Sequence, residues 1–262
     1  MIKESKHFWF NGRKSTDFRI MNVSVTIEPF NEQLTPSKSI EEIYIPGRKK
    51  PYFVDVAEEP LLLQLNFAFL EPWNDRLIDE IVRWLNVDYY VPLYFEENID
   101  RVFYVIPVDG VRKIHNGLKQ GYLSLNMRCD SGGSYSHEIS TPVYDTKKLS
   151  EVQNENMPII KLGNRGHESI YPKIWIEKID DGDLRIINKT NGGEIFEFKN
   201  IDIGEKLFID CENEIIETDK EKTYRYDDFN DNYLELVYGE NVLAVSNNMK
   251  IKFAMRYMFS SF

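Results

Sequence analysis

The chain has 262 residues, enough to bury a substantial core as one large or two ordinary domains. Its formal net charge of -11 argues against a general nucleic-acid-binding surface, because phosphate contacts need clustered Lys and Arg. The two cysteines, Cys129 and Cys211, are too few for a disulfide scaffold and form no CxxC pair for zinc. Both lie in alternating apolar patterns, so we expect buried free thiols.

Residues 1–6 lack the apolar core of a secretory signal. No apolar run reaches the length of a membrane helix, and the most apolar stretch, residues 61–70, is interrupted by Gln64 and Asn66. The sequence therefore predicts a protein that is made and assembled in a reducing cytosol and has no membrane partner.

The N-terminal part opens with short β patterns. Residues 8–10, followed by Asn11-Gly12, predict a strand and a turn. Residues 19–27 alternate between apolar and polar side chains and predict a second strand, which would begin an N-terminal hairpin. Residues 28–42 are polar and predict a loop.

A turn and one further strand follow. Pro46-Gly47 predicts a type II turn, because glycine supplies the positive φ that this turn needs. The basic run Arg48-Lys49-Lys50 then reads either as a solvated loop or as an ion-pairing contact to a neighbouring subunit. Residues 61–69 alternate with a period of two and predict a strand with one buried face.

One helix is predicted, over residues 74–86. Asn74 can accept a backbone N–H as its N-cap, and Asp75 favours the positive end of the helix dipole. One stripe of the helix is apolar, formed by Leu77, Ile78, Ile81, Val82 and Leu85. Further strands are expected at residues 91–95, 102–107 and 122–129.

Residues 131–156 are polar and begin with Ser131-Gly132-Gly133-Ser134, so they predict a linker. The sequence after residue 156 predicts only strands, with turn signals such as Asp181-Gly182 and Asn247-Asn248 between them. The expected strands are 173–179, 184–188, 194–199, 206–211, 215–216, 233–237, 242–245 and 249–259. We therefore expect a mainly β chain of two β-sandwich domains, residues 1–140 with the single helix and a hairpin, and residues 141–262.

No motif indicates catalysis or a cofactor. The four histidines are scattered, and there is no nucleophile elbow, phosphate loop or GxGxxG. Asp228-Phe229-Asn230 begins like a calcium loop, but Tyr233 and Gly239 stand where that loop needs Gly and Glu. The tryptophans could form a sugar-stacking platform, although core packing is the commoner role. The sequence therefore assigns no catalytic, cofactor-binding or metal-binding residue.

Several motifs resemble the distal tail protein (Dit) family of bacteriophages, in the same order along the chain. The opening, Phe8-Trp9-Phe10-Asn11-Gly12 to Ser15-Thr16-Asp17-Phe18-Arg19-Ile20, is similar to F-x-F-N-G-x-x-S-x-D-F-G-I. Arg19 stands where the family has Gly, and Lys49 follows Arg48 where the family often has Asp-Gly. Further similarities are Ile45-Pro46-Gly47-Arg48, Trp84-Leu85, Asn164-Arg165-Gly166 with Pro172, Ile209-Asp210-Cys211 and Leu236 with Gly239 and Asn241.

The resemblance implies a structural protein without catalysis. Six copies would close into a ring through the N-terminal domain, and the C-terminal domain, galectin-like, would face outward. The ring, or hub, would join the tail tube to the tail tip or baseplate. Its partners would be the tail tube protein, a tail-tip or baseplate hub protein of the Tal type and a receptor-binding protein, in a virion tail or prophage-derived particle assembled in the bacterial cytoplasm.

Two other function classes stay open at this point. A carbohydrate-binding module could recognise host cell-wall glycan through the C-terminal domain, because a sandwich fold does not settle function. A glycoside hydrolase would need a pair of carboxylates, and nothing in the sequence prefers one pair over another. We favour the ring-forming tail protein over both.

Overall fold

The structure is a computed structural model that describes residues 2, 4–25 and 35–260. Strands dominate it, and two α-helices and one 3-10 helix occur among the described residues. It divides into two compact units, unit 1 (Met1–Tyr135 with Phe259–Phe262) and unit 2 (Ser136–Met258). The mainly β fold class is confirmed. The chain leaves unit 1 after Tyr135 and returns after Met258, whereas the sequence predicts a single boundary after residue 140.

The core of unit 1 lies against a sheet whose central path runs β2-β1-β7-β8-β9-β6-β3, with antiparallel neighbours throughout. Two short strands extend it, since β10 pairs with both β8 and β21. The strands are β1 Phe8–Phe10, β2 Arg13–Lys14, β3 Ile20–Asn22, β6 Leu62–Phe69, β7 Val91–Phe95, β8 Asn98–His115, β9 Gly121–Cys129, β10 Ser134–Tyr135 and β21 Met258–Phe259.

The first turn is as predicted, but the second strand pairs elsewhere. Asn11 and Gly12 both have positive φ, at 48° and 74°, which lets β1 turn into β2. The 3-10 helix η1 (Ser15–Phe18) follows and ends at Arg19, whose φ of 54° is left-handed. β3 then pairs with β6 and not with β1, so the hairpin predicted from residues 19–27 is wrong in its pairing. Residues 26–27 of that prediction lie outside the described residues.

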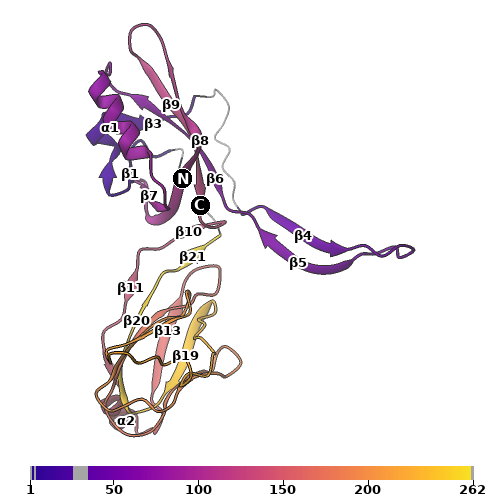
Figure 1. Cartoon of the computed structure of the whole chain (residues 1–262), viewed down its shortest axis with the longest axis vertical. Helices are drawn as coiled ribbons and strands as arrows, with labels where there is room; N and C mark the ends of the chain where they lie inside the picture. Colours follow the sequence, from indigo (N-terminus) through magenta and orange to yellow (C-terminus); the bar gives the residue numbers. More distant parts are fainter. Residues whose placement is uncertain (1, 3, 26–34, 261–262) are drawn as a thin grey trace. The chain divides into compact units, whose positions relative to one another are not determined.

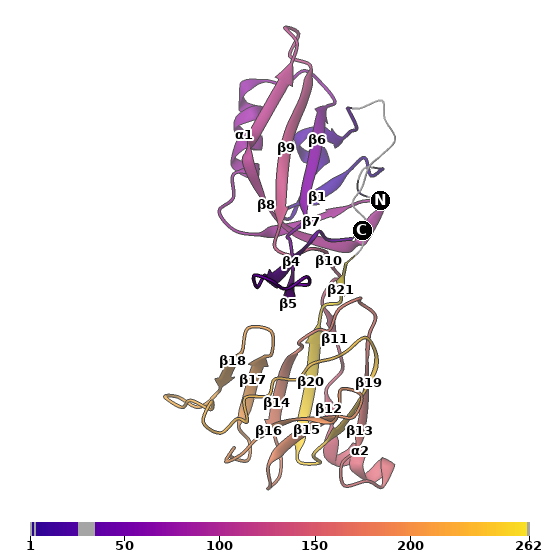
Figure 2. The ribbon, with the colours of Figure 1, turned by 90° about the vertical axis from the view of Figure 1, so that its right-hand side faces the viewer.

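The predicted helix is α1 (Asp75–Leu85), which runs beside the sheet of unit 1 (Figure 2). Its N-cap is confirmed, because Asn74 Oδ1 accepts the backbone N–H of Leu77 at 2.8 Å. The buried stripe differs in part from the predicted one. Trp84 is buried and donates from Nε1 to the carbonyl of Phe10 at 2.8 Å, whereas Val82 is 58% exposed.

Unit 2 is a sandwich of two antiparallel sheets, β11-β20-β14-β17-β18 with β12 beside β20, and β13-β19-β15-β16. Its core of buried side chains draws on strands of both sheets. The elements are β11 Ile139–Ser140, β12 Tyr144–Asp145, α2 Thr146–Gln153, β13 Ile159–Asn164, β14 Lys173–Lys178, β15 Leu184–Asn188, β16 Glu194–Phe198, β17 Lys206–Asp210, β18 Ile215–Thr218, β19 Gly239–Val245 and β20 Met249–Met255.

The predicted linker is largely structured. Residues 131–156 contain β10, β11, β12 and the helix α2. Asp145 caps α2, since its Oδ1 accepts the N–H of Lys148 at 3.2 Å. Gly133 is required by close packing, because a Cβ there would lie 2.2 Å from the carbonyl oxygen of Phe259. The serine and glycine signal therefore marks a tight backbone approach, which composition alone does not distinguish from a flexible segment.

The C-terminal alternation is confirmed over Met249–Met255, but the single strand predicted over residues 249–259 is wrong in length, because β20 ends at Met255 and Met258–Phe259 form the separate strand β21. Met249, Ile251, Phe253 and Met255 are buried, and Lys250 and Lys252 lie on the other face of β20. One further strand prediction is wrong, and one strand was not predicted. Residues 233–237 form no strand and make only a bridge from Leu236 to Ile170, and β13 has no predicted counterpart.

Both cysteines are buried free thiols, as expected. Burial raises the pKa of Cys129 to about 12, and burial likewise raises the pKa of Cys211 to about 12. Both thiols are therefore protonated and chemically inert at neutral pH.

Candidate functional site

A two-stranded hairpin of unit 1 stands out because nothing described covers it. Strands β4 (Lys38–Ile43) and β5 (Tyr52–Glu58) pair only with each other, and every residue of both is exposed (Figure 1). We call this hairpin, residues 38–58, the arm. The sequence predicts a loop over residues 28–42, so the strand β4 corrects that prediction for its part within the described residues. Residues 28–34 lie outside them.

The arm has two faces. Ile40 lies opposite Val56, and Ile43 lies opposite Tyr52. Because side chains alternate along a strand, Ile40 and Ile43, three residues apart on β4, lie on opposite faces. A register shift after Glu41 places Phe53 opposite Glu42 and leaves Val54 as the extra residue of a bulge. One face carries Ile40, Glu42, Phe53 and Val56, of which Ile40 and Phe53 are 63% and 65% exposed. The other face carries Glu41, Ile43, Tyr52 and Asp55, so apolar and acidic side chains are mixed on both faces.

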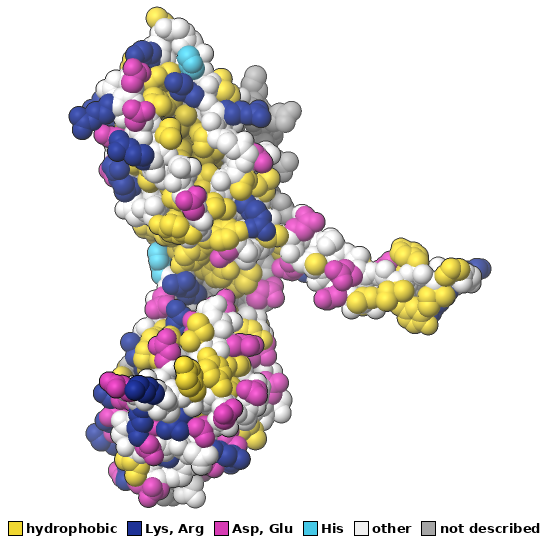
Figure 3. Space-filling model, in the orientation of Figure 1, with side chains coloured by type: hydrophobic (Ala, Val, Ile, Leu, Met, Phe, Trp, Pro, Cys, Tyr) yellow, Lys and Arg dark blue, Asp and Glu magenta, His cyan; other side chains and the backbone are white. Residues whose placement is uncertain are grey.

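The tip of the arm is the predicted type II turn. Gly47 has a φ of 86°, and the N–H of Arg48 donates to the carbonyl of Ile45 at 3.1 Å. The Arg48 guanidinium lies 3.6 Å from the centre of the Tyr52 ring. Figure 3 shows hydrophobic side chains gathered along the arm, with Lys or Arg at its end. Such an exposed apolar surface is typical of a protein–protein contact.

A second apolar feature of unit 1 is a groove of about 440 Å³ beside α1. Ile81 and Leu85 of α1 and Leu123 of β9 are buried at its floor. Val82 and Val111 lie at its exposed side. Asp109 and Gly110 have positive φ at a bulge in β8, which bends the strand at this groove. We call this feature the α1 groove.

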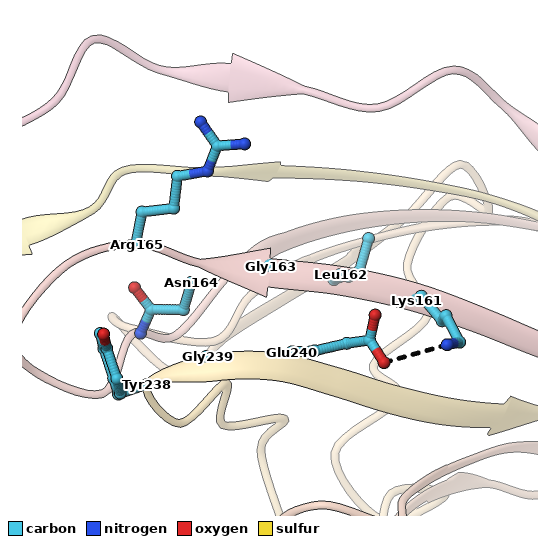
Figure 4. Close-up of a pocket in the computed structure, with 8 residues that line it drawn as sticks. All are labelled: Lys161, Leu162, Gly163, Asn164, Arg165, Tyr238, Gly239 and Glu240. Atoms are coloured by element: carbon cyan, nitrogen blue, oxygen red, sulfur yellow. Dashed lines mark hydrogen bonds and ion pairs between the residues drawn. The ribbon is translucent and has the colours of Figure 1, made fainter.

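Unit 2 has a polar hollow of about 370 Å³ where β13 ends and β19 begins (Figure 4). Lys161 donates to Glu240 at 3.0 Å across the two strands, and Tyr238 is exposed beside them. The neighbouring Asn164 is fully engaged: its side-chain N–H groups donate to the carbonyls of Glu168 and Leu236, and its Oδ1 accepts from Gly166 N–H. The hollow thus lies over a structural hydrogen-bond cluster.

The candidate metal-binding residues do not form a shared site among the described residues. Groups of three or more His, Cys, Asp or Glu that could hold a metal are absent from the described residues. Asp228, from the calcium-like segment, is held by Arg225 Nη1 at 2.9 Å. The hydrogen bond from Asn200, together with Arg225, lowers its pKa below the ordinary carboxyl value despite its desolvation. This carboxylate is therefore part of an ion-pair network within the sandwich.

The tryptophans act mainly in packing. Trp84 stacks 4.0 Å from Phe18, and Trp73 is buried beside Phe69. Trp175 is 38% exposed, but Phe208 lies against it at 5.1 Å between ring centres.

Among the helices that the structure describes, none is long and apolar enough to cross a membrane.

The arm is the feature that sequence reasoning missed. Its signal was present, since residues 52–56 are rich in aromatic and β-branched residues after the turn at Pro46-Gly47. No clear alternation results, because both faces contain apolar side chains, with Phe53 on one face and Tyr52 on the other.

The family comparisons cover both units. Residues 3–131 match a family model described as a phage tail protein N-terminal domain. Residues 143–255 match one described as a phage tail C-terminal domain. A relative, the SPβ prophage-derived uncharacterized protein YomH of Bacillus subtilis (strain 168), is 28% identical over 259 residues, which is 99% of this chain and 100% of the relative.

Solved structures show the same fold at low identity. The Dit (gp 19.1) protein of phage SPP1, described as a paradigm of the hub adsorption apparatus in phages that infect Gram-positive bacteria, aligns with a TM-score of 0.68 and 14% identity over 96% of this chain and 98% of that one. A chain of the phage P2 baseplate in its activated conformation with Ca aligns with a TM-score of 0.53 and 12% identity over 96% and 97%. This chain therefore belongs to the phage tail protein family that the two domain models describe, and its fold is that of the phage distal tail proteins.

Proposed function

We propose that this protein is a structural hub of a phage tail, in which six copies close into a ring that joins the tail tube to the tail tip or baseplate. The observation that carries the proposal is the likeness to the SPP1 Dit hub protein over 96% of the chain. A likeness of both units in one alignment favours the role of the whole protein over that of a single module.

The exposed arm supports assembly through contacts between copies. A two-stranded hairpin alone is at best marginally stable in water, because it buries too little apolar surface. The arm nevertheless exposes large apolar side chains, among them Ile40, Tyr52 and Phe53, on both of its faces. Covering these side chains in an assembly would remove apolar surface from water and order the hairpin at the same time.

The proposed partners follow from the hub role. They are five further copies of this chain, the tail tube protein on one side and a tail-tip or baseplate hub protein of the Tal type on the other, with a receptor-binding protein attached further out. The location is the virion tail or a prophage-derived tail particle, assembled in the host cytoplasm. The function is mechanical and needs no catalysis. The phage tail domain matches favour this role over the glycan-binding alternative.

The ring is tested on the purified full chain. We expect a particle six times the 30.9 kDa mass of one chain by light scattering, and six-fold rings in electron micrographs. Particles isolated from the phage should contain the protein at the tail end, as seen by antibody labelling. A strict monomer at high concentration that is also missing from tail particles would overturn the proposal.

A further inference from the structure

One edge of the unit 2 sandwich is open among the described residues. The sheet β13-β19-β15-β16 has two edge strands, β13 and β16. The edge of β16 is covered, because Asn230 Oδ1 accepts the N–H of Glu197 at 3.1 Å and the N–H of Asn230 donates to the carbonyl of Glu197 at 3.2 Å. Among the described strands, β13 pairs only with β19. An uncovered edge presents backbone groups that can pair with another chain.

The register of β13 shows which of its backbone groups point outward. The N–H of Val245 donates to the carbonyl of Pro158 at 3.0 Å, so this opposed pair is a hydrogen-bonded one. Hydrogen-bonded and non-hydrogen-bonded pairs alternate along an antiparallel ladder, so the next residue, Ile159, points its N–H and C=O away from β19. The side chain of Gln153 lies at this position, where it accepts the Ile159 N–H at 2.7 Å and donates to the Ile159 carbonyl at 3.0 Å.

Lys161 and Gly163 point their backbone groups to the same edge, because residues two apart on a strand face the same way. Both residues are exposed. None of the described hydrogen bonds outside the β13–β19 ladder reaches their N–H or C=O groups, in contrast to Ile159. Lysine side chains often guard an open edge, but Lys161 Nζ donates to Glu240 of β19 at 3.0 Å, over the face of the sheet (Figure 4). The edge is therefore open to the backbone of another strand.

The outer face of β13 indicates the side chain that such a strand carries. Lys161, Gly163 and Arg165 alternate onto this face, and Arg165 is exposed. Gly163 leaves the space between the two cations empty, since a Cβ there has no atom within 4 Å, and the polar hollow lies over it. A residue opposite Gly163 on an added strand points to the same face and has Lys161 and Arg165 as its diagonal neighbours.

A carboxylate is the side chain that complements these charges. Lys161 is already paired with Glu240. Arg165 has no ion pair among the described residues, so its guanidinium can receive an acidic group from outside.

We propose that the open edge of β13 binds an extended segment of a partner protein as an additional antiparallel strand, with an aspartate or glutamate of that segment opposite Gly163. The backbone groups of Lys161 and Gly163 supply the affinity, and Arg165 supplies the selectivity for an acidic side chain. The site lies wholly within unit 2 and goes beyond the hub role, because it functions whether or not six copies close into a ring.

A random library of short peptides, panned against the immobilised full-length protein, tests the edge. The variant Gly163→Pro removes an N–H from the edge and leaves the hydrogen bonds to β19 in place, because Gly163 makes none of them. Gly163→Ala is the matched control, since it keeps the N–H and its methyl group has open space. Selected peptides should bind Gly163→Ala like the parent and Gly163→Pro at least about tenfold more weakly in fluorescence anisotropy, because a backbone hydrogen bond is lost.

Changes to the selected peptide report on backbone pairing without any change to the protein. N-methylation of a peptide amide that faces the edge should abolish binding, whereas N-methylation of the next amide, which faces away, should leave it intact. The charge-reversed variant Arg165→Glu tests the acidic position. It should no longer select aspartate or glutamate in the library and should select lysine or arginine instead.

The outcomes bear on this site separately from the hub proposal. The site is refuted if no peptide distinguishes the parent from a Gly163→Pro variant that keeps the circular dichroism of the parent, or if both N-methylated peptides bind equally. Selection of the same acidic peptides by Arg165→Glu overturns the assigned role of Arg165. Gly163→Pro should form the same high-mass particle as the parent, so a parent without rings contradicts the hub proposal and leaves the peptide result standing.

Discussion

Three buried asparagines fasten the irregular segment before β19 to the sandwich of unit 2. Asn241 Nδ2 donates to the carbonyl of Val237 at 2.8 Å, and its Oδ1 accepts from Val237 N–H at 3.0 Å and from Asn188 at 3.0 Å. Asn164 donates to the carbonyl of Leu236 at 3.0 Å. These amides replace the strand partners that residues 233–237 lack, because buried backbone groups need hydrogen bonds. The asparagines that carried the family resemblance therefore act as determinants of the fold.

Replacing Asn241 by alanine should destabilise unit 2 by about 2 kcal/mol, since it leaves buried backbone and amide groups without partners. Urea denaturation followed by circular dichroism measures the change in the free energy of unfolding. Asn156→Ala is the control, because Asn156 is exposed. That control should change the free energy of unfolding by less than about 0.5 kcal/mol. Equal effects of the two substitutions would refute the structural role of Asn241.

Arg19 adopts a backbone conformation that usually requires glycine. The related motif has glycine at this place, and Arg19 adopts the left-handed φ of 54° that glycine would take. Its N–H donates to the carbonyl of Thr16 at 3.0 Å, and its carbonyl accepts from the N–H of Leu70 at 2.9 Å. The backbone is thus held in the glycine-like conformation by hydrogen bonds on both sides, although the residue has a side chain.

At the scale of elements, an ion-pair network holds the segment between β18 and β19. Arg225 Nη2 donates to Glu205 Oε2 at 2.7 Å, and its Nε donates to Glu205 Oε1 at 2.9 Å. Thr218 donates to the same carboxylate at 2.7 Å, and Arg225 Nη1 donates to Asp228 at 2.9 Å. The Glu205 side chain is fully buried, so its charge depends on these partners.

We expect Arg225→Ala to cost about 3 kcal/mol of unfolding free energy at pH 7, because a buried carboxylate loses its partner. Desolvation would raise the pKa of Glu205, but the hydrogen bonds from Arg225 and Thr218 outweigh it and lower the pKa below the ordinary 4.5. A lowered folded pKa gives stability that is present above the unfolded pKa and is lost as the pH falls through the folded one. The difference between parent and variant should therefore shrink below about pH 4.

The matched control is Lys161→Ala, which removes a cation from the exposed pair with Glu240. It should change the free energy of unfolding by less than about 1 kcal/mol, because water screens an exposed pair. Urea denaturation at pH 7 and pH 3 gives all the values required. If Arg225→Ala lowers the free energy of unfolding by the same amount at pH 7 and pH 3, the pH dependence of stability does not come from these carboxylates.

The same elements show what the sequence could predict. Alternating apolar residues in the sequence identified β6 and β20, because each of these strands has one face in a core. Asn74 identified the start of α1, because its side chain forms the N-cap. The segment 233–237 looks like a strand but is held by asparagine side chains, whose hydrogen bonds no local pattern encodes. The arm was missed because it lies outside both cores and carries apolar side chains on both faces, so its pattern is not that of a strand with one buried face.

At the scale of the whole molecule, the chain contains two separate hydrophobic cores. One is formed by side chains of unit 1, including Phe8 and Phe67, and the other by side chains of unit 2, including Phe253. Each core is closed by its own sheets, and the chain passes between the units after Tyr135 and after Met258. The two units should therefore behave as separate cooperative units in unfolding.

Two large-to-small substitutions in the cores test this independence. Phe67 and Phe253 are both fully buried, so Phe67→Ala and Phe253→Ala should each cost about 3–5 kcal/mol in their own unit. Hydrogen exchange read by mass spectrometry follows peptides of the two units separately. Phe253→Ala should speed exchange in β14, β19 and β20 and leave β6 to β9 unchanged, because it weakens only the sandwich in which Phe253 lies. Phe67→Ala should do the reverse, and faster exchange throughout the chain in either variant would show that the two cores unfold as one.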